Sequence, residues 1–286
     1  MKSQDWMLII GVFASAAACF SFLSCASMEQ RAVQYAAEAA EKMEPPAPGT
    51  IISESDLEGL PQAAQRYFRY SGVIGKARIN SFSVVLEGRI RNDPSSKWMD
   101  ILMRQYNRLD APARIVYIES PKPPMAGIDS FIAGRGRMHI KTMNFITVVD
   151  SKGPEMDISA LVTFLNDLCL CPSAYFALPL VWKEIDRDRV ELSMDYRGMT
   201  ARARLTIDGE GKLTNWESGD RYAEVKGKNL KDRWSTPFYS HAEIQGMRIP
   251  STGAGIHDYN GAPYVYVELD RIHSLRLDAS SLPPRP

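Results

Sequence analysis

The side chains that could perform chemistry in this sequence are few and widely spaced. The four histidines never form a His-Glu-x-x-His motif or another close pair of metal ligands. No Gly-x-Ser-x-Gly or Ser-x-x-Lys motif is present to activate a serine. The sequence therefore predicts no metal site, no cofactor and no serine-based acyl transfer. Each histidine is interpreted as a hydrogen-bonded strand residue, and they are His139, His241, His257 and His273.

Three aspartates are candidates for acid–base chemistry, since two carboxylates at a set separation can hydrolyse a glycoside. Asp150 and Asp186 stand beside predicted turns, where an aspartate usually caps backbone N–H groups. Asp129 lies inside a strand pattern and is harder to explain, although a structural role is favoured for it too. One alternative for this chain is therefore an envelope enzyme acting on glycan or lipid, with Asp129 and a histidine such as His139 in its site.

The segment Gly134-Arg135-Gly136 has the glycine content of a phosphate-binding loop. Such loops lie between a strand and a helix, so that helix N–H groups face the anion, whereas here a strand pattern follows. A tight turn between two strands is the better interpretation of both glycines.

Large, flexible apolar side chains are abundant in the predicted strands. Residues 98–103 and 140–149 are apolar on both faces, so each face of those strands needs a cover. Helices are expected to form one cover, and the other is either a ligand or a second protein layer. A helix-filled core is the simpler interpretation, but Met-rich concave surfaces also suit apolar ligands. The residues expected to line such a pocket are Trp98, Met103, Phe131, Met138, Trp182 and Tyr264.

Residues 1–25 have the layout of a secretory signal. Lys2 precedes an uncharged apolar run, Met7 to Leu23, that barely reaches the roughly 20 residues needed to span a membrane. Phe22-Leu23-Ser24-Cys25 is similar to a lipobox, after which a lipoprotein signal peptidase cuts and the cysteine is diacylated, although leucine is usual where Phe22 stands. We expect Cys25 to be the lipid attachment site. An uncleaved anchor and ordinary cleavage near Ala26 are the alternatives, and each of the three places the protein outside the cytoplasm, in the periplasm or at the cell surface.

The balance of charge limits the classes of partner that the sequence predicts. The chain carries 34 basic and 34 acidic residues, and removal of the leader takes away one of each, so no attraction to nucleic acid is indicated. The membrane, reached through the N-terminal anchor, and an apolar ligand are the expected partners.

Cys169 and Cys171 are too close in sequence for an ordinary disulfide and are interpreted as small buried apolar residues.

The remaining segments divide into a stalk and one domain. Residues 26–52 combine a helical stretch, rich in Ala and Glu, with the Pro-rich spacer 45–49, and they are expected to form the stalk. Residues 53–280 are expected to form a single domain, which opens with a helix and continues as many short strands separated by turns. One helical insert interrupts the strands near residues 156–180. Short connections require antiparallel pairing, so the predicted fold is α+β and mainly β: a large curved antiparallel half-barrel with a few helices packed on one face.

Several motifs follow one another along the domain in a distinctive order. They are Leu60-Pro61, Arg66-Tyr67, Gly88, Trp98, Gly127–Phe131, Gly134–Gly136, Val181–Asp186, Asp208-Gly209, Arg221 and Gly246–Pro250. Their order resembles that of a bacterial family of unknown function, the one numbered 6544. The resemblance covers roughly residues 57–277 and implies a shared fold without implying an activity. One departure is Cys169-Leu170-Cys171, where small and aromatic residues are more usual in the family.

The architecture predicted for this chain is similar to the half-barrel of periplasmic lipoprotein carriers, although a fold does not dictate a function. The leading hypothesis is a binding protein of the cell envelope that holds a lipid or another apolar ligand in its curved sheet. The enzyme described above and a structural or assembly partner in the envelope are the alternatives.

Overall fold

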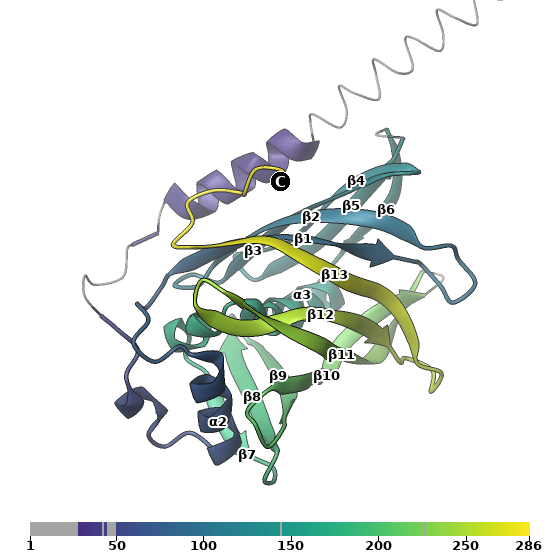
Figure 1. Ribbon diagram of the computed structural model, residues 1–286. Helices are drawn as coiled ribbons and strands as arrows, with labels where there is room; N and C mark the ends of the chain where they lie inside the picture. Colours follow the sequence, from purple (N-terminus) through teal and green to yellow (C-terminus); the bar gives the residue numbers. More distant parts are fainter. Residues whose placement is uncertain (1–27, 42, 45–49, 144, 226) are drawn as a thin grey trace, which may run out of the picture.

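One antiparallel sheet of 13 strands dominates the computed structural model, which describes residues 28–41, 43–44, 50–143, 145–225 and 227–286 (Figure 1). Two meanders, β1 to β6 and β7 to β13, are joined where β1 pairs with β13. The strands are β1 (Ser81–Ile90), β2 (Met99–Arg108), β3 (Ala113–Pro121), β4 (Pro124–Ile132), β5 (Arg135–Thr142), β6 (Ile146–Lys152), β7 (Val181–Glu184), β8 (Arg189–Tyr196), β9 (Met199–Ile207), β10 (Leu213–Val225), β11 (Lys228–Ile244), β12 (Met247–His257) and β13 (Tyr264–Leu277).

The connection between the two edge strands, β6 and β7, is helical. It contains α3 (Pro154–Asp167) and the 3-10 turns η2 (Leu168–Leu170) and η3 (Pro172–Ala177). Pro154 suits the first turn of α3, where its missing N–H group has no intrahelical partner to lose. Figure 1 shows α3 inside the curve of the sheet, where it contacts β4, β5 and β6 on one side and β9 and β10 on the other.

The main core lies between this helical insert and the concave face of the sheet. Leu161, Phe164, Leu165 and Leu168 of the insert are fully buried against strand residues such as Trp216. Two shorter helices close the same core near β8, β9 and β12: η1 (Glu54–Leu57) and α2 (Gln62–Ser71), which ends at Gly72 in the left-handed conformation. The predicted fold class, a curved antiparallel sheet with a few helices packed on it, is confirmed.

A second, smaller core lies on the convex face. Helix 28–41 crosses the outside of the sheet beside the C-terminal tail (Figure 1). Its residues Met28, Ala32 and Ala36 are fully buried against a strand surface that includes Tyr106 and Tyr117. This helix belongs to the segment expected to act as a stalk, and it lies directly on the sheet. Protein therefore covers both faces here, the concave one with α3 and the convex one with helix 28–41.

Several local predictions agree with these elements. All four histidines lie in strands, in β5, β11, β12 and β13. Cys169 and Cys171 are free and buried, and burial raises the pKa of each thiol. The turn expected around Gly134 joins β4 to β5, and its φ of 81° explains the glycine there.

Candidate functional site

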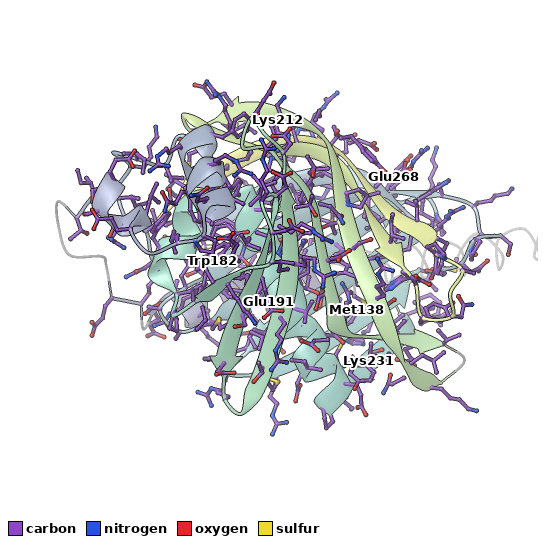
Figure 2. The ribbon with its side chains drawn as sticks, turned by 90° about the horizontal axis from the view of Figure 1, so that it is seen from below. Met138, Trp182, Glu191, Lys212, Lys231 and Glu268 are labelled. Atoms are coloured by element: carbon purple, nitrogen blue, oxygen red, sulfur yellow. The ribbon has the colours of Figure 1, made fainter. Side chains whose placement is uncertain are left out.

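The six residues expected to line one apolar pocket are spread over the sheet. Phe131 is fully buried in the main core, where its ring contacts those of Phe164 and Tyr196. The ring of Trp98 contacts the guanidinium groups of Arg89 and Arg91. Figure 2 shows Met138 and Trp182 in separate parts of the molecule. Met103 of β2 and Tyr264 of β13 are only partly buried.

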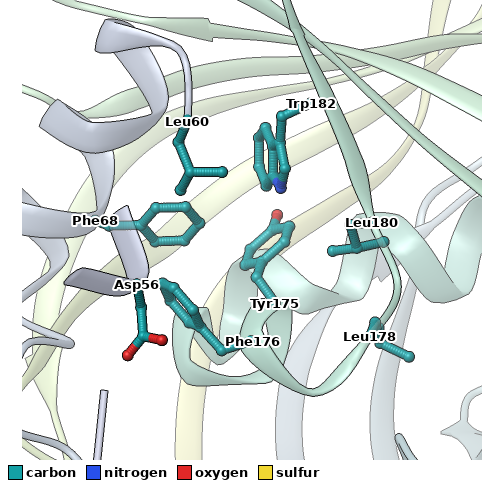
Figure 3. A pocket seen from close by; sticks show the side chains of 8 residues that line it. All are labelled: Asp56, Leu60, Phe68, Tyr175, Phe176, Leu178, Leu180 and Trp182. Atoms are coloured by element: carbon teal, nitrogen blue, oxygen red, sulfur yellow. The ribbon is translucent and has the colours of Figure 1, made fainter. Parts of the chain in front are cut away.

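Trp182 does line a cavity, although with different neighbours. The cavity has a volume of about 190 Å³ and lies between α2, η3 and the edge strand β7 (Figure 3). We call it the aromatic cavity. Its lining residues are Asp56, Leu60, Phe68, Tyr175, Phe176, Leu178, Leu180 and Trp182.

Ring contacts hold the aromatic side of this cavity in place. Phe68, Tyr175 and Trp182 point toward one another in Figure 3. The centroid of the Trp182 ring lies 5.6 Å from that of Phe68 and 5.7 Å from that of Tyr175. The pair of Trp182 and Phe68 is edge-to-face, and the pair of Trp182 and Tyr175 is tilted. Edge-to-face pairs stabilise packing by about 0.5–1.5 kcal/mol beyond the effect of the buried area. The wall is therefore preformed by residues from three separate elements.

The size of the aromatic cavity limits what it can hold. Sites for drug-sized ligands have volumes of about 300–1,000 Å³, so this one is smaller. A dry apolar cavity of about 150 Å³ nevertheless binds a benzene-sized molecule. The aromatic cavity therefore has room for one ring or for the end of an alkyl chain, and not for a whole lipid.

Asp56 is the one charged group in the lining. Its carboxylate accepts a hydrogen bond of 2.8 Å from the backbone N–H of Ser53 and pairs with Arg78 at 2.5 Å. The backbone hydrogen bond and the guanidinium keep the pKa of Asp56 below its usual value, despite partial burial. The carboxylate is therefore ionised and already partnered, which leaves the rest of the lining to determine what binds.

The two residues considered for an enzyme site lie on opposite faces of the sheet. In the pairing of β4 with β5, Asp129 faces Met138 and His139 faces Ile128, so the side chains of Asp129 and His139 point to different sides. They cannot share a site, because the alternation of side chains along adjacent strands separates them.

Asp129 instead belongs to a buried ion-pair network. Its Oδ2 atom lies 2.6 Å from a terminal nitrogen of Arg114, whose Nε atom lies 2.5 Å from Asp167 of α3. Gln105 also donates a hydrogen bond to Asp167, at 2.7 Å. This network attaches the C-terminal end of α3 to β2, β3 and β4, so the function of Asp129 is structural.

His139 lines a second cavity, of about 180 Å³, on the convex face beside helix 28–41. The lining is basic, but two of its arginines already have partners: Arg135 pairs with Asp157 and Arg137 with Asp150. The full lining is Arg31, Tyr35, Ile128, Ser130, Ile132, Arg135, Arg137 and His139.

The described parts of the chain contain no group of three or more His, Cys, Asp or Glu side chains placed to hold a metal ion. Within the same residues, no helix has the length and hydropathy needed to cross a membrane. Cys25 and the whole leader lie outside the described residues.

Sequence reasoning missed most of the aromatic cavity, because its lining comes from segments far apart in the chain. Trp182 is one of the residues predicted to line a pocket, whereas Tyr175 falls in the predicted helical insert and Phe68 is not among the predicted pocket residues. Residues 67–70, 175–176 and 182 are all rich in aromatic side chains, which is the one sequence feature that these segments share. The sequence does not show that the three segments are in contact.

Two solved structures overlap loosely with this fold. A LolA superfamily protein from Nitrosomonas europaea is 12% identical, with a TM-score of 0.40 over 82% of this chain and 96% of that one. A DUF1329 family protein from Desulfovibrio piger is 10% identical, with a TM-score of 0.32 over 86% and 93%. Both scores are low, so neither likeness carries an argument about function.

The family assignment comes from the sequence itself. No curated protein matches the chain. A family model matches residues 50–269, which is most of the domain and confirms the resemblance carried by its motifs. The chain therefore belongs to the family of unknown function DUF6544.

Proposed function

We propose that this protein is a binding protein of the cell envelope that holds an apolar group in the aromatic cavity. The observation that carries the proposal is the lining: seven of its eight side chains are aromatic or aliphatic, and the eighth is the ionised and partnered Asp56. Ligand sites typically combine such an apolar wall with few polar groups. The volume of about 190 Å³ selects the end of an acyl chain or a single ring.

Tryptophan quenching by a brominated fatty acid tests this binding directly. Dodecanoic acid brominated at its terminal carbon should quench the fluorescence of the full-length protein saturably, because the bromine would lie against Trp182. The variant Trp182→Phe should lose most of the quenching, although the chain has four other tryptophans.

A cavity-filling variant and a matched control separate this site from unspecific adsorption. Leu180→Trp places a larger side chain in the lining and should weaken the apparent affinity at least tenfold. Leu230→Trp adds the same side chain at an exposed position of β11 and should leave the affinity unchanged. Equal quenching in the wild-type protein and in Leu180→Trp would remove the aromatic cavity from the proposal.

The envelope location is a separate part of the proposal. It rests on the apolar leader and on the lipobox-like residues that end at Cys25. In a bacterial host, the protein should sediment with membranes, and mass spectrometry of its N-terminal peptide should show a diacylated Cys25. The variant Cys25→Ala should release the domain or leave the leader uncleaved. An unmodified leader on cytosolic protein would contradict the location.

A second candidate, an assembly partner in the envelope, is supported by a different surface. Four large apolar side chains are exposed around the β5–β6 connection: Met143, Phe145, Ile146 and Val148, with exposed fractions of 46–55%. Exposed apolar groups on an edge strand favour pairing with another chain. The measurement is the molar mass in solution, which should rise with concentration in the wild-type protein and stay monomeric in Val148→Lys. A monomeric wild-type protein at all concentrations would argue against self-association through this edge.

A further inference from the structure

A buried histidine–carboxylate pair lies on β11 and β12, in a region to which no function has been assigned. The side chain of Asp232 has no exposed surface, and its Oδ2 atom is hydrogen-bonded to Nδ1 of His257. Its other oxygen accepts the backbone N–H of Asp258 at 2.8 Å. Because an ionised carboxylate can only accept hydrogen bonds, Nδ1 carries the proton and Nε2 of His257 is left as an acceptor.

Aromatic side chains hold this imidazole in place. The ring of Tyr266 lies 4.1 Å from that of His257, with 30° between the planes. Trp234 donates a hydrogen bond of 3.2 Å from Nε1 to the hydroxyl oxygen of Tyr266. Since that oxygen accepts the indole proton, the hydroxyl group of Tyr266 keeps its own proton for another partner.

The guanidinium of Arg221 completes the cluster from β10, where Arg221 is paired in register with Asp232. It lies over the ring of Trp234, 4.1 Å from the centroid. Two of its nitrogens, Nε and Nη1, are buried and have no hydrogen-bond partner, and the guanidinium forms no ion pair with any residue that the structure describes. Buried N–H donors of a cation that make no hydrogen bond and no ion pair are costly, so this arrangement favours an anionic ligand.

We propose that Arg221, His257 and Tyr266 form a binding site for an oxyanion, the carboxylate or phosphate group of a small ligand, and that His257 takes up one proton from solvent when the anion binds. Arg221 supplies charge and N–H donors, Tyr266 supplies its hydroxyl proton, and Nε2 of His257 becomes a donor once protonated. The site is independent of the aromatic cavity, which lies between α2, η3 and β7.

The charges around His257 explain why binding of an anion is coupled to uptake of a proton. Burial lowers the pKa of His257, the hydrogen bond to Asp232 opposes this shift, and the positive charge of Arg221 lowers the pKa further. The other titratable groups whose rings face it are Tyr259, Tyr264 and Tyr266. In the free protein the imidazole is therefore neutral at neutral pH. A bound anion adds negative charge beside Nε2 and stabilises the protonated form.

Nuclear magnetic resonance of the full-length protein, labelled with ¹³C at histidine Cε1, tests the site. Sodium acetate and inorganic phosphate are titrated separately at constant ionic strength. At least one probe should shift the His257 signal saturably, and the other three histidines serve as internal references. Above the pKa of free His257, the affinity should fall about tenfold for each pH unit, as uptake of one proton requires. The more tightly bound probe identifies the oxyanion.

Variants distinguish binding at this site from general attraction to a positive surface. Arg221→Gln should weaken binding at least tenfold, whereas Arg233→Gln, which removes an exposed arginine on the adjacent strand, should leave it unchanged. The pH profile of the wild-type protein is an independent test if Arg221→Gln unfolds. The proposal is overturned if neither probe gives a saturable shift, if the affinity does not depend on pH, or if both arginine variants behave alike.

Discussion

Gly136 of β5 lies directly against Met156 of α3: a Cβ atom on residue 136 would lie 2.3 Å from the carbonyl oxygen of Met156 and 2.7 Å from the Cβ atom of Ala160. The helix can approach the concave face of the sheet this closely because residue 136 has no side chain. Gly134, two residues earlier, serves the turn, so the two glycines have different functions.

Replacement of Gly136 by alanine should destabilise the protein. The methyl group would collide with the backbone of α3, and overpacking of this kind costs about 1–3 kcal/mol. The denaturant midpoint should fall in Gly136→Ala. It should stay close to the wild-type value in Gly209→Ala, because nothing lies within 4 Å of the added methyl group there. Equal midpoints for the two variants would show that α3 does not contact the sheet as described.

Arg114 should be essential for stability near neutral pH. Arg114→Gln leaves the carboxylates of Asp129 and Asp167 buried without their cation, and breaking a buried ion pair costs about 3–5 kcal/mol. The exposed pair of Arg189 and Asp186 provides the control, and Arg189→Gln should change the unfolding midpoint far less.

The loss of stability caused by Arg114→Gln should also depend on pH. Burial already raises the pKa of Asp167 above its usual 3.8, and removal of Arg114 raises it further. A carboxyl group whose pKa is higher in the folded state stabilises the fold below its unfolded pKa, and this contribution is lost as the pH rises through the folded pKa. The difference between variant and wild type should therefore shrink as the pH falls from 7 toward 4. A difference that grows on acidification would contradict this account.

Helix 28–41 should detach without unfolding the sheet when its small buried residues are enlarged. Ala36 has no exposed surface, so Ala36→Leu should displace the helix from the convex face at a cost of about 1–3 kcal/mol. Ala37 is exposed, so Ala37→Leu adds the same side chain without a clash. Amide hydrogen exchange should accelerate in residues 28–41 of the first variant alone. Unchanged protection in both variants would refute the docking of this helix.

Cys169 and Cys171 should not react with thiol reagents in the native protein. Burial raises the pKa of both thiols, so the reactive thiolate is scarce, and the reagent also lacks access. Peptide mapping after treatment with iodoacetamide at pH 8 should find both cysteines unmodified, and both modified after denaturation. Rapid native labelling would show that the helical insert opens.

Local patterns in the sequence predicted most of the strands and helices correctly. Alternation of side chains with period two and short turns identified the antiparallel sheet, since both depend on neighbours in the chain. The helical insert was equally visible, because its apolar residues repeat with helical spacing. The same reasoning predicts a helical stretch within residues 26–52. It does not predict that this helix packs on Tyr106 and Tyr117, because these residues are far away in the chain.

The sites depend on contacts that no local pattern contains. Phe68 and Trp182 are separated by 114 positions in the sequence, and Asp232 and His257 by 25, yet each pair is in contact. The sequence by itself determined which segments are strands and helices and which side chains are apolar, because these properties follow from residue type and periodicity. Only the tertiary structure decided which faces are covered, that Asp129 pairs with Arg114, and which side chains meet in a cavity, because strand register and helix docking set distances between residues far apart in the chain.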